Sequence, residues 1–93
     1  MLYIRKVRVV SPGTSNQHIT AVGYSGAVSG PLIEITRDIA VRLIEGGTSF
    51  RSHNDNTRSE AAVTVAVSSA RTKYIRTVAD GRESNNLLEL PRF

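Results

Sequence analysis

The feature that most constrains the fold is the alternation of side chains from residue 60 to residue 68. Every second position carries an aliphatic side chain, at Ala61, Val63, Val65 and Val67, and small or polar residues stand between them. Successive side chains of a β-strand point to opposite faces, so a period of two predicts a strand with one buried face. Residues 73–79 follow a turn at 69–72, which predicts that the two strands form an antiparallel hairpin.

Several other segments also favour extended structure. Residues 2–10 are rich in β-branched and aromatic side chains and end at Ser-Pro-Gly, a strong turn signal. Residues 18–24 alternate, residues 32–35 form a short apolar run, and residues 48–51 form a further extended piece. The chain is therefore expected to be dominated by a sheet.

A helical period is found at residues 36–45. Thr36 is a suitable N-cap, Asp38 stands in the first turn where the helix dipole favours an acid, and two glycines follow the last residue. Ile39 and Leu43, with Ala40 and Ile44, are predicted to form the apolar stripe. The sequence thus predicts one helix packed on the sheet.

The remaining segments are expected to connect or cover these elements. Residues 25–31 are small and glycine-rich, and residues 52–59 are entirely polar, so both are predicted to be loops, the second without any buried side chain. Asp80 and Gly81 predict a turn. The tail from residue 82 carries three leucines, which favours a docked segment: Leu87, Leu88 and Leu90.

The predicted fold class is α+β, a small two-layer domain with a mostly antiparallel sheet of four or five strands and one helix packed on it. The 93 residues are expected to form a single domain, 1–93. The core is expected to contain apolar side chains of the helix and of the alternating strand, namely Ile39, Leu43, Ile44, Val63, Val65 and Val67.

Composition excludes several classes of protein. No apolar stretch approaches the roughly 20 residues of a membrane span, and charged residues interrupt the N-terminus where a signal peptide would be apolar. The absence of cysteine removes disulfides, zinc knuckles, iron–sulfur clusters and thiol catalysis, and it fits the cytoplasm. We therefore expect a cytoplasmic protein without a membrane association or a cofactor.

The charge balance suggests a binding surface. Twelve basic residues against eight acidic give a net charge of +4, and ten of the twelve are arginine, which binds carboxylates and phosphates through two parallel donors. If the first and last long strands are neighbours, their basic and aromatic residues form one stripe: Tyr3, Arg5, Lys6, Arg8, Arg71, Lys73, Tyr74 and Arg76. The alternative is that these residues are ordinary solvated side chains.

Two short motifs carry a family resemblance. Residues 74–81 read Tyr-Ile-Arg-Thr-Val-Ala-Asp-Gly, and residues 86–91 read Asn-Leu-Leu-x-Leu-Pro. With them, the chain resembles a small family of bacterial and phage proteins catalogued only as a domain of unknown function. The resemblance covers most of the chain and implies a shared fold, but no activity that could be transferred.

Few residues suit catalysis or metal binding. His53 and Asp55 could share a metal, but two ligands in a polar loop make a poor site, so a solvated loop is the preferred interpretation. His18 lies on an alternating strand and is expected to be a packed or hydrogen-bonded histidine. No Gly-Lys-Ser or Gly-Lys-Thr phosphate loop occurs. We predict that the protein is not an enzyme and holds no metal.

Two functional classes remain. The preferred one is a small binding module that acts through protein–protein contacts, with tyrosines and arginines as anchors. By analogy with the phage-borne relatives it could be a phage or mobile-element inhibitor of a host defence complex. The alternative is a basic nucleic-acid-binding domain that places the stripe on phosphates, although few aromatics are present for stacking. The sequence leaves a homodimer open in either class.

Overall fold

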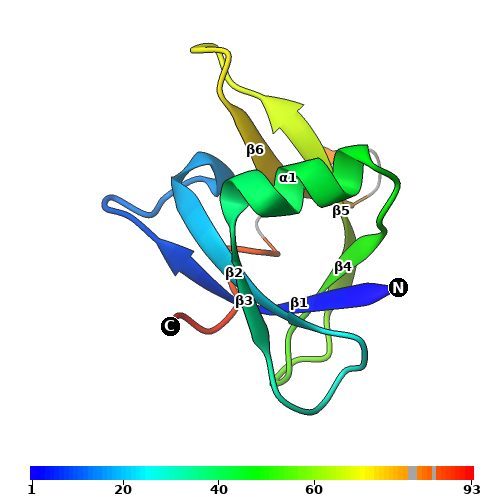
Figure 1. Ribbon diagram of the computed structural model, residues 1–93. Helices are drawn as coiled ribbons and strands as arrows, with labels where there is room; N and C mark the ends of the chain where they lie inside the picture. The colour runs from blue at the N-terminus through cyan, green and yellow to red at the C-terminus, as the bar shows by residue number, and fades with distance from the viewer. Residues whose placement is uncertain (80–81, 85) are drawn as a thin grey trace.

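The computed structural model describes residues 1–79, 82–84 and 86–93. Within them seven strands form one sheet in the order β3-β2-β1-β4-β5-β6-β7, and one α-helix covers it (Figure 1). The strands are β1 (Leu2–Val9), β2 (Ile19–Ser25), β3 (Ile33–Thr36), β4 (Phe50–His53), β5 (Glu60–Val67), β6 (Lys73–Ala79) and β7 (Arg82–Ser84); the helices are η1 (Asn16–His18), a 3₁₀ turn, and α1 (Arg37–Glu45).

The predicted α+β class is confirmed, with more strands than the four or five expected. Neighbouring strands are antiparallel except for β1 and β4, which run parallel over Leu2–Ile4. The short pieces at β3, β4 and β7 all join the sheet, which raises the count. The turn predicted at Asp80 and Gly81 lies outside the described residues.

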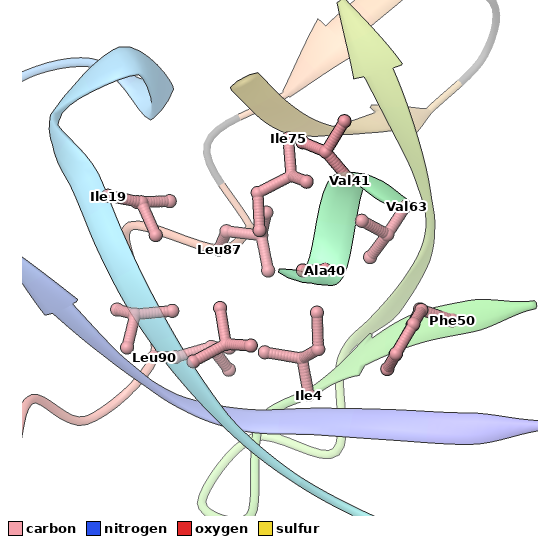
Figure 2. Packing of buried hydrophobic residues seen from close by; sticks show 11 residues of the cluster. Ile4, Ile19, Ala40, Val41, Phe50, Val63, Ile75, Leu87 and Leu90 are labelled. Atoms are coloured by element: carbon pink, nitrogen blue, oxygen red, sulfur yellow. The ribbon is translucent and has the colours of Figure 1, made fainter. Parts of the chain in front are cut away.

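The core lies inside the curve of the sheet, and α1 crosses its open side (Figure 1). Figure 2 shows side chains from separate elements meeting there. The buried cluster is Ile4, Val7, Ile19, Val22, Ala40, Val41, Phe50, Val63, Ile75, Leu87 and Leu90. Residues 3–5 and residues 74–76 both read Tyr-Ile-Arg, and the isoleucines of this repeat, Ile4 and Ile75, are both fully buried. The repeat therefore reflects two strands that each contribute an isoleucine to the core.

Helix α1 begins and ends as predicted, but its buried face differs from the prediction. The Thr36 hydroxyl accepts a hydrogen bond from the Ile39 backbone N–H, and Gly47 has φ +103°, the left-handed conformation that ends helices. Ala40 and Val41 are buried, whereas Ile39 is 44 % exposed and Leu43 and Ile44 are only partly buried. The contact line therefore runs along Ala40 and Val41, where the small Ala40 lets the helix approach the sheet closely.

Burial along β5 decreases from its start to its end. Ala61 and Val63 are buried, Val65 is partly buried, and Val67 is 59 % exposed. The predicted alternation is thus present, but the expected burial of Val67 is wrong. The reason is geometric, since the β5–β6 hairpin continues past α1 and away from the body of the protein (Figure 1). Nothing in the described chain covers its far end.

Strand β1 contains an irregularity that decides which side chains are outside. The pairing with β2 runs Ile4 with Tyr24 and then Lys6 with Gly23, so Arg5 is an extra residue on β1. Such a β-bulge shifts the alternation by one position. Ile4 and Val7, three residues apart, are consequently both buried in the core. The two basic residues between them stay on the other face.

The tail docks, as predicted. Leu87 and Leu90 are 0 % and 3 % exposed and belong to the core. The Val7 N–H donates to the Pro91 carbonyl at 3.0 Å, and the Phe93 N–H donates to the Val7 carbonyl at 3.2 Å. Residues 91–93 therefore lie beside β1 beyond the point where β4 pairs with it.

The predicted loop 52–59 is partly wrong. Ser52 and His53 belong to β4, and Ser52, His53 and Asn54 are all buried. The Asn54 side chain accepts hydrogen bonds from the backbone N–H groups of Asn56 and Thr57 and donates one to the Glu89 carbonyl. These polar side chains can be buried because they have hydrogen-bond partners. Across the part of the chain described here, no helix is long and apolar enough to cross a membrane.

Candidate functional site

The predicted stripe divides into two groups. Strands β1 and β6 are separated in the sheet by β4 and β5, so the condition for one continuous stripe is not met. Tyr3, Arg5, Lys6 and Arg8 lie on β1, while Lys73, Tyr74 and Arg76 lie on β6 and Arg71 lies in the turn before it.

The β1 arginines are engaged within the protein. Arg5 donates two hydrogen bonds to Asp55, from Nε to Oδ1 at 3.0 Å and from Nη2 to Oδ2 at 2.8 Å, and a third to the Gly30 carbonyl. Its side chain is only 11 % exposed. Arg8 lies 3.2 Å from Glu34 and stacks 4.8 Å above the Phe93 ring. Arg5 is thus largely withdrawn from solvent, whereas Arg8 remains half exposed.

The residues of the second group differ from one another in exposure. Tyr74 is buried, and Arg76 is half-buried. Lys73 Nζ lies 2.7 Å from Glu45 Oε2 at the end of α1, and both side chains are about half exposed. Arg71 has φ +63° in the hairpin turn and is exposed. We call Val67, Arg71 and Lys73 the hairpin tip.

A cluster that the sequence interpretation missed lies on the outer side of β1, β4 and β5. His53 Nδ1 is 2.7 Å from Glu60 Oε2, and its Nε2 is 3.7 Å from Asp55 Oδ1. Glu60 Oε1 also accepts a hydrogen bond from Arg51 Nε at 3.2 Å. Arg51, Glu60, His53, Asp55 and Arg5 follow one another in this cluster, with a carboxylate on each side of His53, and are called the ion-pair network below. The Tyr3 ring meets the His53 ring edge-on, with centroids 6.1 Å apart.

The ion-pair network determines which nitrogen of His53 carries a proton, and it shifts the pKa values of neighbouring charged groups. Because an ionised carboxylate can only accept, the short contact with Glu60 places a proton on His53 Nδ1. The hydrogen bond from Arg5 holds the pKa of Asp55 below its ordinary value, and Asp55 in turn raises the pKa of Arg5. The hydrogen bond from His53, assisted by Arg51, lowers the pKa of Glu60.

These shifts predict acid sensitivity. A carboxylate whose pKa is lower in the folded state contributes stability above its unfolded pKa and loses it as the pH falls through the folded value. The contribution of Asp55 and Glu60 is therefore complete above about pH 5 and declines below about pH 4. We expect the melting temperature of Asp55→Asn to fall less steeply over this range than that of wild type. Melting curves from pH 7 to about pH 3 test this, with Asp38→Asn, an exposed carboxyl, as the control. Parallel curves for wild type and Asp55→Asn would contradict the assignment.

The geometry around His53 does not match a metal centre. Among the described residues, no three His, Asp or Glu side chains are grouped so as to hold a metal ion. Glu60 and Asp55 approach different ring nitrogens, so they cannot share one ion with His53. The prediction that His53 lies in a solvated loop is nevertheless wrong, because the side chain is 9 % exposed and is held between two carboxylates.

His18 lies elsewhere, in a cleft between α1 and the β5–β6 hairpin. Its Nδ1 accepts hydrogen bonds from the backbone N–H groups of Thr14 and Ser15, so the expectation of a hydrogen-bonded histidine is confirmed, but the residue ends η1 and does not lie on the predicted strand. The cleft encloses about 240 Å³ and is called the helix–hairpin cleft; it is lined by Gln17, His18, Arg37, Ser68, Ala70, Thr72 and Tyr74.

Sequence signals for these features are weak but present. Asn54 is a typical turn-forming residue, and its turn brings Asp55 back toward β1. The pairing of His53 with Glu60 follows from a β4–β5 hairpin, which residues 48–51 and 60–68 could have suggested. The pairing of Arg5 with Asp55 spans fifty residues and depends on the parallel contact between β1 and β4.

Comparison with known proteins identifies a family. A family model described as "Protein of unknown function (DUF3892)" matches residues 3–91. No curated protein and no solved structure gives a match. The expected similarity to a family of unknown function is therefore confirmed, and the function has to be argued from the residues of this chain.

Proposed function

Since the chain belongs to the DUF3892 family of proteins of unknown function, we propose from its own residues that it is a non-enzymatic module acting through protein–protein contacts. The observation that carries the proposal is the hairpin tip. Val67 is 59 % exposed at the end of a hairpin that extends from the body of the protein, Lys73 is its cross-strand partner, and Arg71 is exposed in the turn between the two strands. An apolar centre with a charged rim is the usual composition of a protein interface.

The chemistry of the hairpin tip defines the partner. An exposed aliphatic side chain fits a small apolar pocket, and Arg71 and Lys73 fit carboxylates around it. The pair between Lys73 and Glu45 is solvent-exposed and contributes little to stability, so Lys73 can exchange Glu45 for a carboxylate of the partner. The partner surface is therefore apolar at its centre and acidic at its rim.

The contacts of the arginines on β1 also favour a protein partner over a nucleic acid. Arg5 and Arg8 already have carboxylate partners within the chain, and β1 is not adjacent to β6. A stripe of free cations along both strands, as a phosphate-binding surface requires, is thus disfavoured. The specific form of the proposal is a cytoplasmic module, encoded by a phage or mobile element, that inhibits a host defence complex.

The decisive experiment compares two exposed valines. Val67→Asp places a negative charge in the apolar pocket of a partner whose rim is acidic, whereas Val10→Asp adds the same charge at another exposed valine, 51 % accessible. We expect a protein captured from lysate of the source cell by wild type and Val10→Asp to be lost with Val67→Asp. Loss of a central interface residue typically costs about 2 kcal/mol, roughly thirtyfold in affinity.

Two results would overturn the proposal. One is capture of the same proteins by wild type and Val67→Asp. The other is micromolar binding of unrelated duplex or single-stranded nucleic acid that weakens about a thousandfold between roughly 50 and 200 mM salt, as many phosphate contacts would produce. Sedimentation of the purified protein shows in addition whether the partner is a second copy of the chain, in which case Val67→Asp dissociates the dimer.

A further inference from the structure

The helix–hairpin cleft is built from three parts of the chain that are distant in sequence. Gln17 and His18 come from η1, Arg37 begins α1, and the remaining lining residues come from the β5–β6 hairpin. Its volume of about 240 Å³ is below the range of roughly 300–1,000 Å³ of pockets for drug-sized ligands. The cleft is therefore of a size to hold one small chemical group.

The polar groups that line the cleft favour an acceptor ligand. Arg37 and His18 supply nitrogen donors, and Ser68, Thr72 and Tyr74 carry hydroxyl groups, while none of the described residues that line the cleft carries a carboxylate. The Ser68 hydroxyl already accepts the Thr72 N–H at 3.1 Å, which leaves its proton for donation. A ligand rich in acceptors is thus the chemical complement of these side chains.

Arg37 has unused donor capacity at this place. Its Nη1 donates to the Gln17 carbonyl at 3.3 Å, which holds the guanidinium across the cleft between α1 and η1. Its Nε is buried and has no hydrogen-bond partner within the described residues. The nearest carboxylate oxygen, on Asp38, is 3.9 Å from this nitrogen, and the Asp38 side chain is 80 % exposed. Because this nitrogen is shielded from solvent while the side chain as a whole is 25 % exposed, an anion in the cleft would meet the terminal Nη groups of Arg37.

His18 supplies a second oriented donor. Its Nδ1 accepts the backbone N–H groups of Thr14 at 3.1 Å and Ser15 at 3.2 Å. A neutral imidazole that accepts at Nδ1 carries its proton on Nε2. The ring orientation is fixed by the same two hydrogen bonds. Arg37 is also the first residue of α1, whose N-terminus has a positive partial charge.

From these observations we infer that the helix–hairpin cleft binds a small oxyanion of the phosphate type, either free phosphate or the phosphate group of a small monoester. Arg37 supplies the charge, and His18 and the hydroxyl groups of Ser68 and Thr72 supply further donors. The inference does not depend on the proposed protein contact, which uses Val67 and not the lining of the cleft.

An NMR titration of the ¹⁵N-labelled full chain with inorganic phosphate, at constant ionic strength set by chloride, tests the inference. We expect saturable shifts in the millimolar range at the backbone amides of Gln17, His18, Arg37 and Thr72. Arg37→Gln should weaken binding about tenfold or more, as loss of a charge-assisted hydrogen-bond donor does. Arg42→Gln, which removes the same charge from an exposed position of the same helix, should leave the affinity unchanged. A parallel titration with ribose 5-phosphate distinguishes the two sources, because a monoester site prefers it to free phosphate.

The spectrum of each variant shows whether it is folded. If Arg37→Gln is not folded, the phosphate affinity of Arg37→Lys tests the inference in its place. Lysine keeps the charge but loses the planar donor, so the affinity should lie between those of wild type and Arg37→Gln. The inference is overturned if phosphate causes no saturable shifts at the cleft, or if Arg42→Gln weakens binding as much as Arg37→Gln, which would indicate attraction by net charge alone.

Discussion

Removal of residues 85–93 is expected to lower the free energy of unfolding by several kcal/mol and to leave little folded protein at room temperature. Leu87 and Leu90 are buried in the core, and each contributes roughly 1.5–3 kcal/mol through the apolar surface that it buries. The deletion also removes the hydrogen bonds between Val7 and the tail. Total stabilities of about 5–15 kcal/mol are typical of folded proteins, so the loss is a large share. Thermal and urea unfolding followed by circular dichroism measures it.

Single substitutions separate the effect of burial from that of chain length. Leu87→Ala is expected to cost about 2–5 kcal/mol because it leaves a cavity in the core. Leu88→Ala changes the neighbouring, only partly buried leucine and should cost clearly less. Equal melting temperatures for Leu87→Ala, Leu88→Ala and wild type would show that the tail does not support the core.

The second large effect is expected from Val63→Asp. Val63 is 6 % exposed and lies in the core between β5 and α1, where a carboxylate would have no partner. Burial of an unpaired charge is strongly destabilising, so the variant should be unfolded or should fold only at low pH with a protonated side chain. The matched variant Val67→Asp lies on the same face of the same strand but is 59 % exposed. Its stability should stay within about 0.5 kcal/mol of wild type.

Comparison of the two variants by thermal unfolding also supports the binding experiment, which requires that Val67→Asp is folded. If Val67→Asp were as destabilised as Val63→Asp, the far end of the hairpin would be packed, and the hairpin tip could not be a free surface. If neither were destabilised, the assignment of Val63 to the core would be wrong.

The elements of this fold could be predicted because each depends on local periodicity. The alternation on β5 and the capping residues of α1 are visible within ten residues of sequence. The depth of burial could not be predicted in the same way. Ile39 and Val67 continue their apolar patterns, yet both are exposed. Ile39 faces away from the line where α1 meets the sheet, and Val67 lies on the part of the hairpin that extends past α1.

The functional candidates depended on longer-range information. The bulge at Arg5 changes which residues of β1 face outward, and a strict period of two cannot show it. The ion-pair network joins β1 to the β4–β5 segment, and it depends on the parallel pairing of β1 with β4. No turn motif in the sequence predicts this pairing. Arg37 and His18 meet the hairpin only because η1 and α1 pack against β6.

The position of the tail has a consequence for synthesis of the protein. Strand β1 has β4 as its neighbour only as far as Ile4, and beyond it the neighbour is residues 91–93. Ribosomes add about 5–20 residues per second, so β1 is made seconds before this segment. During that time the second half of β1 presents unpaired backbone groups, and unpaired strand edges can associate with other chains. We therefore expect nascent chains stalled before residue 86 to be bound by chaperones and to resist folding, and synthesis of residues 86–93 to be the event that completes the pairing of β1.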